Sequence, residues 1–149
     1  MAAVEFARSR VIALIKDLSP EQLATRPQGF RNSLSSLVVR CAGAKASFAA
    51  MITGQPVAPD LRSELYLDQP SSPLYQPEGE TVTTLEAKWE KAHAVLRSAL
   101  AAVKGDSFDR SVVRPGGGHS FTLRWLMTLI TFHTPDHFGQ MVMIKQHLG

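Results

Sequence analysis

The spacing of apolar residues divides the chain into four long amphipathic segments. Apolar side chains recur three and four residues apart, which is the period of an α-helix. The segments are residues 3–18, 33–53, 83–104 and 122–149. Each helix must bury its apolar stripe, and four such stripes can be buried against one another in a bundle. The pattern therefore predicts an all-α, four-helix-bundle domain over residues 1–149.

The predicted helices are joined by connections of unequal length. A short helical turn over residues 20–24 follows the first helix, with Ser19 as its cap. Residues 55–80 are long and contain five of the nine prolines. We expect them to cross the length of the bundle, with a lid or an arm onto a partner as alternatives. Residues 107–121 are typical of a small hairpin, with three consecutive glycines near its tip.

Residues that favour helix ends lie where the apolar pattern begins and stops. Asn32 or Ser33 is the expected N-cap of the second helix, and Gly54 is its expected C-cap. Thr83 fits a capping box with Glu86 three residues later. Thr122 is expected to cap the last helix.

The last helix carries two histidines on its inward face. His133 and His137 are four residues apart, so their imidazoles lie on neighbouring turns and can bind one metal ion. The alternative is a pair of hydrogen-bonded core histidines. Pro135 stands between them and removes the amide that would bond the carbonyl of residue 131, so we expect a kink. Two histidines do not make a tight metal site, and the spacing supplies no third ligand.

The same helix has a second apolar surface, oblique or opposite to the inward stripe. Its members are Trp125, Leu129, Phe132 and Met143. One side of each helix in a four-helix bundle normally faces water, so an apolar outer face needs a covering. We expect a twofold homodimer through this face, because symmetric dimers are the commonest oligomers. The alternative is that residues 55–80 fold over it.

Composition and charge exclude several classes of protein. The net charge of +3 is small and the basic residues are scattered without a nucleic-acid motif, so no nucleic-acid partner is expected. The charged residues in the N-terminal segment argue against a signal peptide, and no membrane span is expected. We expect a cytoplasmic protein. The single cysteine, Cys41, cannot form an internal disulfide and lies in an apolar run, as a buried packing residue would.

Three stretches together resemble the DinB/YfiT-like superfamily of small bacterial helical-bundle proteins. They are LSPEQLATRP after the first helix, SLSSLVVRCAGA at the start of the second, and TLRWLMTLITFHTPDHFGQMVMIKQHLG at the end. The last is the most specific, since HxxxH is followed by GQ and a terminal LG. The resemblance covers essentially the whole chain. It implies a four-helix bundle, often a homodimer, and in many members a divalent metal held by three histidines.

The resemblance also exposes a departure in the second helix. His133 and His137 match the pair in the last helix, but the third histidine is replaced by Arg40. An arginine stays protonated, has no lone pair to donate, and repels a divalent cation. Cys41 follows directly, about 100° further round the helix, and could substitute only if the helix were rotated.

Three functions remain open at this point. The first is a DinB-like protein of unestablished activity, stress-related and with an incomplete metal site. The second is a metal-dependent enzyme, as the resemblance implies, in which Zn or Ni on His133 and His137 serves a thiol S-transferase or hydrolase. The third is a metal-free pocket in which Arg40 and the two histidines bind a small anion. The catalytic residues, the substrate and the occupancy of the metal site stay open.

Overall fold

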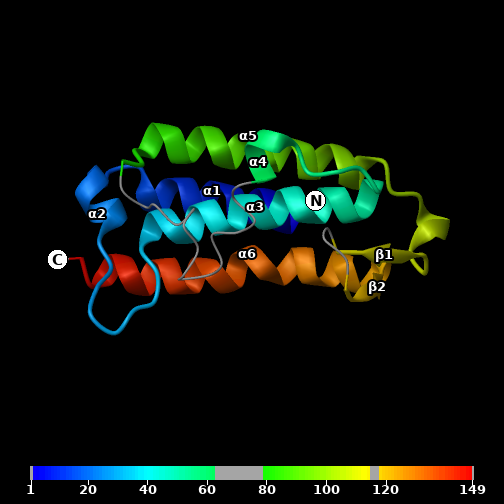
Figure 1. The fold of residues 1–149 in the computed structure, drawn as a ribbon. Coiled ribbons are helices and arrows are strands. Elements are labelled where there is room, and N and C mark those ends of the chain that lie inside the picture. The colour runs from blue at the N-terminus through cyan, green and yellow to red at the C-terminus, as the bar shows by residue number, and fades with distance from the viewer. Residues whose placement is uncertain (1, 63–78, 115–117, 149) are drawn as a thin grey trace.

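The computed structural model describes residues 2–62, 79–114 and 118–148. Figure 1 shows four long helices packed side by side, with the short elements at their ends. The long helices are α1 (Ala2–Ile15), α3 (Leu34–Thr53), α5 (Val82–Ala101) and α6 (Leu123–Gln146). The short elements are α2 (Pro20–Ala24), α4 (Pro59–Arg62), η2 (Gly105–Ser107), β1 (Ser111–Val113) and β2 (Ser120–Thr122). The predicted all-α bundle with one small hairpin is confirmed.

The order of helices in the bundle requires a long crossover. α3 packs against both α5 and α6, and α1 packs on the opposite side of the bundle against the same two helices. In Figure 1, α3 and α5 run in the same direction, while α1 and α6 run the other way. The chain must therefore return along the bundle between the end of α3 and the start of α5. α4 lies in this connection; the rest of the predicted loop, residues 63–78, lies outside the described residues.

Most of the predicted caps are observed, and one is displaced. The Ser33 side chain accepts a hydrogen bond from the amide of Ser36, and Gly54 ends α3 with a left-handed φ of 73°. The Thr122 side chain caps α6. The capping box predicted at Thr83 is wrong, because the cap of α5 is Thr81.

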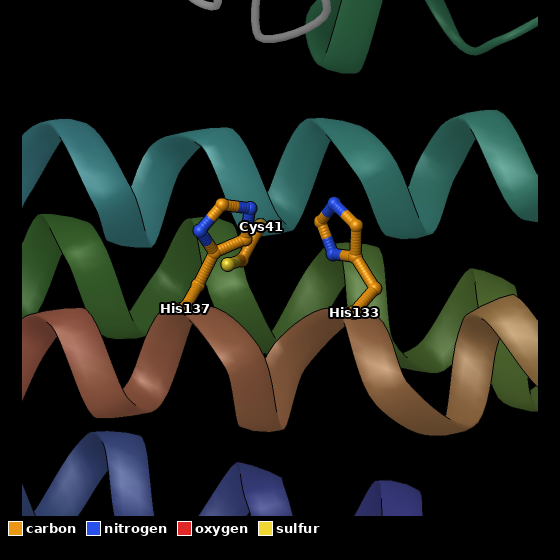
Figure 2. Close-up of side chains that lie close together, drawn as sticks. All are labelled: Cys41, His133 and His137. Atoms are coloured by element: carbon orange, nitrogen blue, oxygen red, sulfur yellow. The ribbon is translucent and has the colours of Figure 1, made fainter.

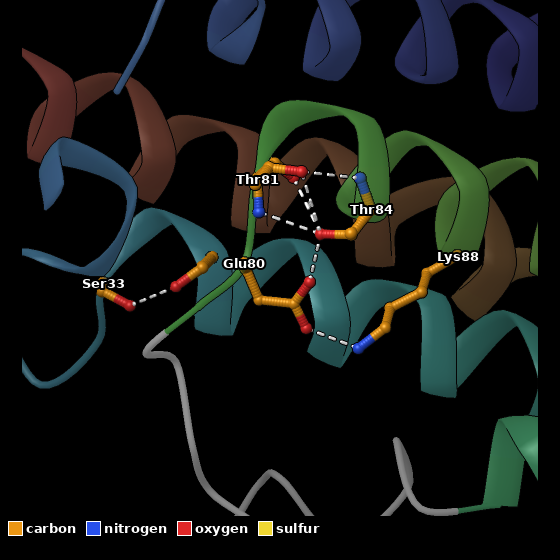
Figure 3. A network of polar contacts seen from close by, with 6 residues as sticks. Ser33, Glu80, Thr81, Thr84 and Lys88 are labelled. Carbon is orange, nitrogen blue, oxygen red and sulfur yellow. Dashed lines mark hydrogen bonds and ion pairs between the residues drawn. The ribbon is translucent and has the colours of Figure 1, made fainter. Parts of the chain in front are cut away.

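The contacts around Thr81 explain why α5 begins earlier than predicted. The Thr84 hydroxyl accepts from the Thr81 amide at 2.9 Å, and it donates to a carboxylate oxygen of Glu80 at 2.6 Å (Figure 3). The other Glu80 oxygen accepts from the Lys88 ammonium at 2.5 Å. Glu80 is thus tied to the first two turns of α5, which fixes the chain just before Thr81 and makes it the favoured cap.

The core runs the length of the bundle, and α3 is its most buried helix. Cys41 and Trp89 belong to one apolar cluster, and Phe48 and Ile130 belong to a second, nearer the hairpin. Among the described residues, only α3 is long and apolar enough to cross a membrane, with a mean hydropathy of 1.2. However, 83% of that stretch is buried inside the bundle, as expected for the central helix of a packed domain.

The hairpin positions the start of α6. Val112 pairs with Phe121 in the antiparallel ladder of β1 and β2. The backbone amide of Leu123 then donates to the Arg110 carbonyl at 2.9 Å, which fixes the first residue of α6 against the strand before it. The guanidinium of Arg110 donates to the carbonyl of Ile52, so the hairpin is also anchored to the end of α3.

Candidate metal centre

The two histidines of α6 lie side by side and point toward α3 (Figure 2). Their ring centroids are 4.7 Å apart with an interplanar angle of 76°. His137 is buried and His133 is half-buried, so both belong to the inward face, as predicted. α6 continues as one helix through Pro135. The missing amide therefore does not separate the two imidazoles, which stay on consecutive turns.

Cys41 of α3 completes a cluster of three metal-ligand side chains. One ligand atom from each of Cys41, His133 and His137 lies within 4.8 Å of the other two. The sequence favours Cys41 as a packing residue, with a ligand role only as the less favoured alternative, and the structure places it beside both histidines. A signal was available in the sequence, since Cys41 falls on the apolar stripe of its helix and Arg40 lies on the flank. Burial of that stripe turns the thiol toward the histidines.

The environment of His133 keeps its imidazole neutral at pH 7. Its pKa is lowered to about 4, first by burial and then by the positive charges of His137 and Arg40. Asp136 acts in the opposite direction. The ring also packs edge-on against Phe48, with centroids 5.3 Å apart. A neutral imidazole has the free lone pair that a metal ligand needs.

Arg40 acts electrostatically on His133. Its side chain is half-buried, and its charge contributes to lowering the pKa of His133. The pocket expected from Arg40, His133 and His137 stays a prediction. Arg40 supplies positive charge there and no lone pair.

Lys45 is a further charged residue near the cluster that sequence reasoning did not single out. It lies one helical turn after Cys41 and is only 2% exposed. Its ammonium nitrogen is 4.3 Å from the centroid of the Trp89 ring. Burial lowers the pKa of Lys45 to about 8, and the nearby charge of Cys41 opposes that shift. The only signal in the sequence was the i, i+4 spacing from Cys41, which places the two on one face.

The other histidines have separate surroundings. His93 is buried, and its Nε2 atom is 3.0 Å from a carboxylate oxygen of Glu5. His119 is exposed after the hairpin tip. The Nδ1 atom of His147 lies 2.8 Å from the Met143 carbonyl oxygen, and its ring packs on Phe30. In the described ranges, the only group of three or more metal-ligand side chains is the one at Cys41.

The donor set fits a divalent transition metal. Thiolate and imidazole are the ligands that Zn²⁺ prefers, and three protein ligands leave a coordination position open, as in catalytic sites. Bond lengths of about 2.0 to 2.3 Å place tetrahedral ligands roughly 3.5 Å apart. The ligand atoms lie at most 4.8 Å apart here, so binding a metal would bring them closer together by about 1 Å. Rotation of the side chains can supply that movement.

The outer face of α6 is largely uncovered. Trp125, Phe132 and Met143 are 47%, 66% and 53% exposed, whereas Leu129 is half-buried and packs against the core. The Trp125 ring stacks on Phe121 with centroids 4.4 Å apart. The face is therefore open to a partner along most of its length, and the homodimer stays a prediction.

The fold and the cluster define a DinB/YfiT-like helical bundle with a candidate metal centre between its second and last long helices. Within that superfamily, the chain belongs to the mycothiol-S-transferase family, whose family model matches residues 1–148. No curated protein matches the sequence.

Solved structures share the fold at low sequence identity. A conserved protein from Enterococcus faecalis is 13% identical with a TM-score of 0.74, and the match covers 99% of this chain and 93% of that one. YfiT from Bacillus subtilis is 16% identical with a TM-score of 0.68, and the match covers 99% of this chain and 85% of YfiT. YfiT is described as a probable metal-dependent hydrolase with an unusual four-helix bundle topology. A mycothiol-dependent maleylpyruvate isomerase is 12% identical with a TM-score of 0.58; the match covers 99% of this chain but 58% of the isomerase.

Proposed function

We propose that this protein is a metal-dependent thiol S-transferase, and that Cys41, His133 and His137 hold its divalent metal. The observation that carries the proposal is the approach of the three ligand atoms to within 4.8 Å of one another. They come from two helices that are far apart in the sequence. Membership of the mycothiol-S-transferase family supports mycothiol, or a similar low-molecular-weight thiol, as one substrate.

The chemistry follows from the residues of the cluster. His133 offers a neutral imidazole, His137 a second ring nitrogen and Cys41 its sulfur, which together would hold Zn²⁺ or Ni²⁺. Such an ion would supply the Lewis acidity that lowers the pKa of the thiol substrate. In the transfer, the thiolate sulfur forms a bond to an electrophilic carbon of the second substrate. The leaving group departs with its electron pair, and the thiol proton passes to solvent.

Arg40 has a separate part in this proposal. Its guanidinium cannot bind the metal, but it lies near His133 and carries a permanent positive charge. It would bind an anionic group of the thiol or of its acceptor by charge-assisted hydrogen bonds. The same observation favours a second candidate function, a metal-free site in which Arg40 and the two histidines bind a small anion.

Metal analysis of protein purified without a histidine tag tests the proposal. We expect near-stoichiometric Zn or Ni, lost in both Cys41→Ala and His137→Ala. His119→Ala is the matched control, because that histidine is exposed and outside the cluster. The loaded enzyme should conjugate mycothiol to an activated haloarene, and His137→Ala should not.

Two results would contradict the proposal in different ways. Metal that survives in Cys41→Ala would remove Cys41 from the ligand set. Absence of metal after incubation with Zn²⁺, together with retention of a carboxylate or phosphate that Arg40→Ala no longer binds, would establish the anion-binding function instead. Absence of both metal and anion would leave a fold without a working site.

A further inference from the structure

A small cavity lies beside Lys45, where all four long helices of the bundle meet. Its volume is about 10 Å³, which is enough for one water-sized particle. Three of the side chains that line it are polar, those of Lys45, Thr131 and Thr134. The rest of the lining is apolar and consists of Val4, Ala7, Phe48, Leu96, Ile130 and Pro135. The size excludes a phosphate, a sulfate or a carboxylate, so the cavity can hold only a water molecule or a monatomic ion.

Two of the three polar groups in the cavity lack a partner. The Thr131 hydroxyl donates to the Met127 carbonyl at 2.9 Å and is engaged within its own helix. Lys45 and Thr134 are only 2% and 6% exposed. Within the part of the chain that the structure describes, neither the Lys45 ammonium nor the Thr134 hydroxyl makes a hydrogen bond. Buried polar groups are almost always hydrogen-bonded, so these two donors point to a ligand that accepts from both.

The Lys45 ammonium also lacks a direct counter-charge. In the described ranges, no carboxylate oxygen lies within ion-pair distance of it. Glu5 and Glu90 act on Lys45 from further away. The Glu5 carboxylate is held by His93 at 3.0 Å. The Glu90 carboxylate is held by Arg8 at 2.7 Å. The carboxylates on this side of the bundle are therefore engaged with other partners.

The remaining contact of Lys45 holds the cation without neutralising it. The ammonium nitrogen is 4.3 Å from the centroid of the Trp89 ring, whose face attracts a cation but carries no net charge. Burial lowers the pKa of Lys45 to about 8, so the side chain still carries its charge at pH 7. A buried charge is costly unless an opposite charge compensates it. A water molecule in the cavity adds no charge, whereas an anion compensates the ammonium directly.

We propose that this cavity binds a single halide ion, such as chloride, between the Lys45 ammonium and the Thr134 hydroxyl. The lining offers hydrogen-bond donors and contains no acidic side chain, as an anion site requires. Thr131 and Pro135 are exposed, so the ion reaches the cavity from the surface of α6.

The halide site is separate from the metal-ligand cluster and does not depend on it. The two sites share one wall, because Phe48 lines the cavity and also packs edge-on against His133, with ring centroids 5.3 Å apart. The ion contacts residues of α1, α3, α5 and α6. Since the site exists only in the folded bundle, halide binding stabilises the packing of all four helices beside the candidate metal centre.

Thermal unfolding in two sodium salts tests the proposal. Sodium chloride is compared with sodium gluconate at equal ionic strength, because gluconate is too large for the cavity. We expect the melting temperature to be higher in chloride by roughly 3 °C at about ten times the dissociation constant, and to rise further with concentration. Lys45→Met removes the charge and keeps a long side chain, so it should abolish the difference between the salts. Lys104→Met is the control for an exposed lysine and should keep it.

Two threonine variants form a matched pair that does not depend on the folding of Lys45→Met. Both Thr134→Val and Thr131→Val remove a hydroxyl from the cavity wall at nearly constant volume. Only the Thr134 hydroxyl is free to donate to the ion, so Thr134→Val should weaken chloride binding about tenfold or more. Thr131→Val should leave it unchanged. An equal response of the two variants would overturn the proposal, because a general loss of packing would then explain it.

Crystals soaked in sodium bromide locate the ion directly. We expect an anomalous difference peak between the Lys45 nitrogen and the Thr134 oxygen. Density without an anomalous peak, together with equal melting temperatures in both salts, would identify a water site and refute halide binding. A bromide peak without any chloride-dependent stabilisation would mean an adventitious ion only, and would also count against the proposal.

Discussion

His133 and His137 keep their rings 4.7 Å apart on one face of α6 although Pro135 stands between them. The proline deprives the carbonyl of Thr131 of its helical donor, and proline inside a helix is destabilising. Its own side chain is exposed, so the position is not fixed by core packing. A helix that carries two inward histidines therefore includes a local weakness at the site itself.

Replacing that proline should stabilise the protein. Pro135→Ala restores the backbone donor and removes the ring from an exposed helical position, so we expect the free energy of unfolding to rise by about 1 kcal/mol or more. Urea denaturation measures it, with Asp136→Ala as a neighbouring exposed control. A loss of stability in Pro135→Ala would show that the surrounding packing depends on the proline.

Arg40→His should strengthen metal binding. The change removes a permanent positive charge near His133 and adds an imidazole on the helix that faces the two histidines. We expect Zn²⁺ affinity to increase about tenfold or more, as judged by competition with a chromophoric chelator. Arg31→His, on the exposed segment before α3, is the control and should have no effect. Weaker binding in Arg40→His would show that Arg40 supports the ligands through their positioning.

The open face of α6 predicts a homodimer that one charge can disrupt. Phe132 is 66% exposed in the middle of this face, so Phe132→Glu should place a charge in the interface and shift the protein to a monomer. Phe6→Glu is the matched control, because Phe6 is 61% exposed on α1. Light scattering after gel filtration measures the mass. A monomeric unmodified protein, or a dimer that survives Phe132→Glu, would exclude this interface.

The contact between Glu5 and His93 predicts a stability difference that depends on pH. The hydrogen bond with His93 lowers the pKa of the Glu5 carboxyl below its ordinary 4.5. A carboxyl whose folded-state pKa is depressed contributes stability above its unfolded pKa, and loses that contribution as the pH falls through the folded value. Glu5→Gln should therefore lower the melting temperature at neutral pH, and the difference should vanish in acid.

Thermal melts of both proteins across that range would test the Glu5 prediction. The effect should be small, because Glu5 is well exposed to solvent. A difference that persists unchanged in acid would mean that Glu5 acts through packing and not through its charge.

Local patterns in the sequence determined the elements of this protein and the side chains that α6 turns inward. The helical period, Ser33, Gly54 and Thr122 marked the long helices, because caps and periodicity are properties of neighbouring residues. The length of the connection after α3 indicated the crossover. The spacing of His133 and His137 placed them on one face before any partner helix was known.

Tertiary structure decided which residue of α3 meets those histidines. Arg40 and Cys41 are neighbours in sequence but about 100° apart around the helix axis, so the rotation of α3 about its own axis decides which of them faces α6. The apolar stripe of α3 favours the Cys41 side, but the rotation itself is set by how α3 packs against α5 and α6 together. The same packing buried Lys45 over Trp89. The composition of the site follows from contacts between helices, whereas the helices themselves follow from contacts along the chain.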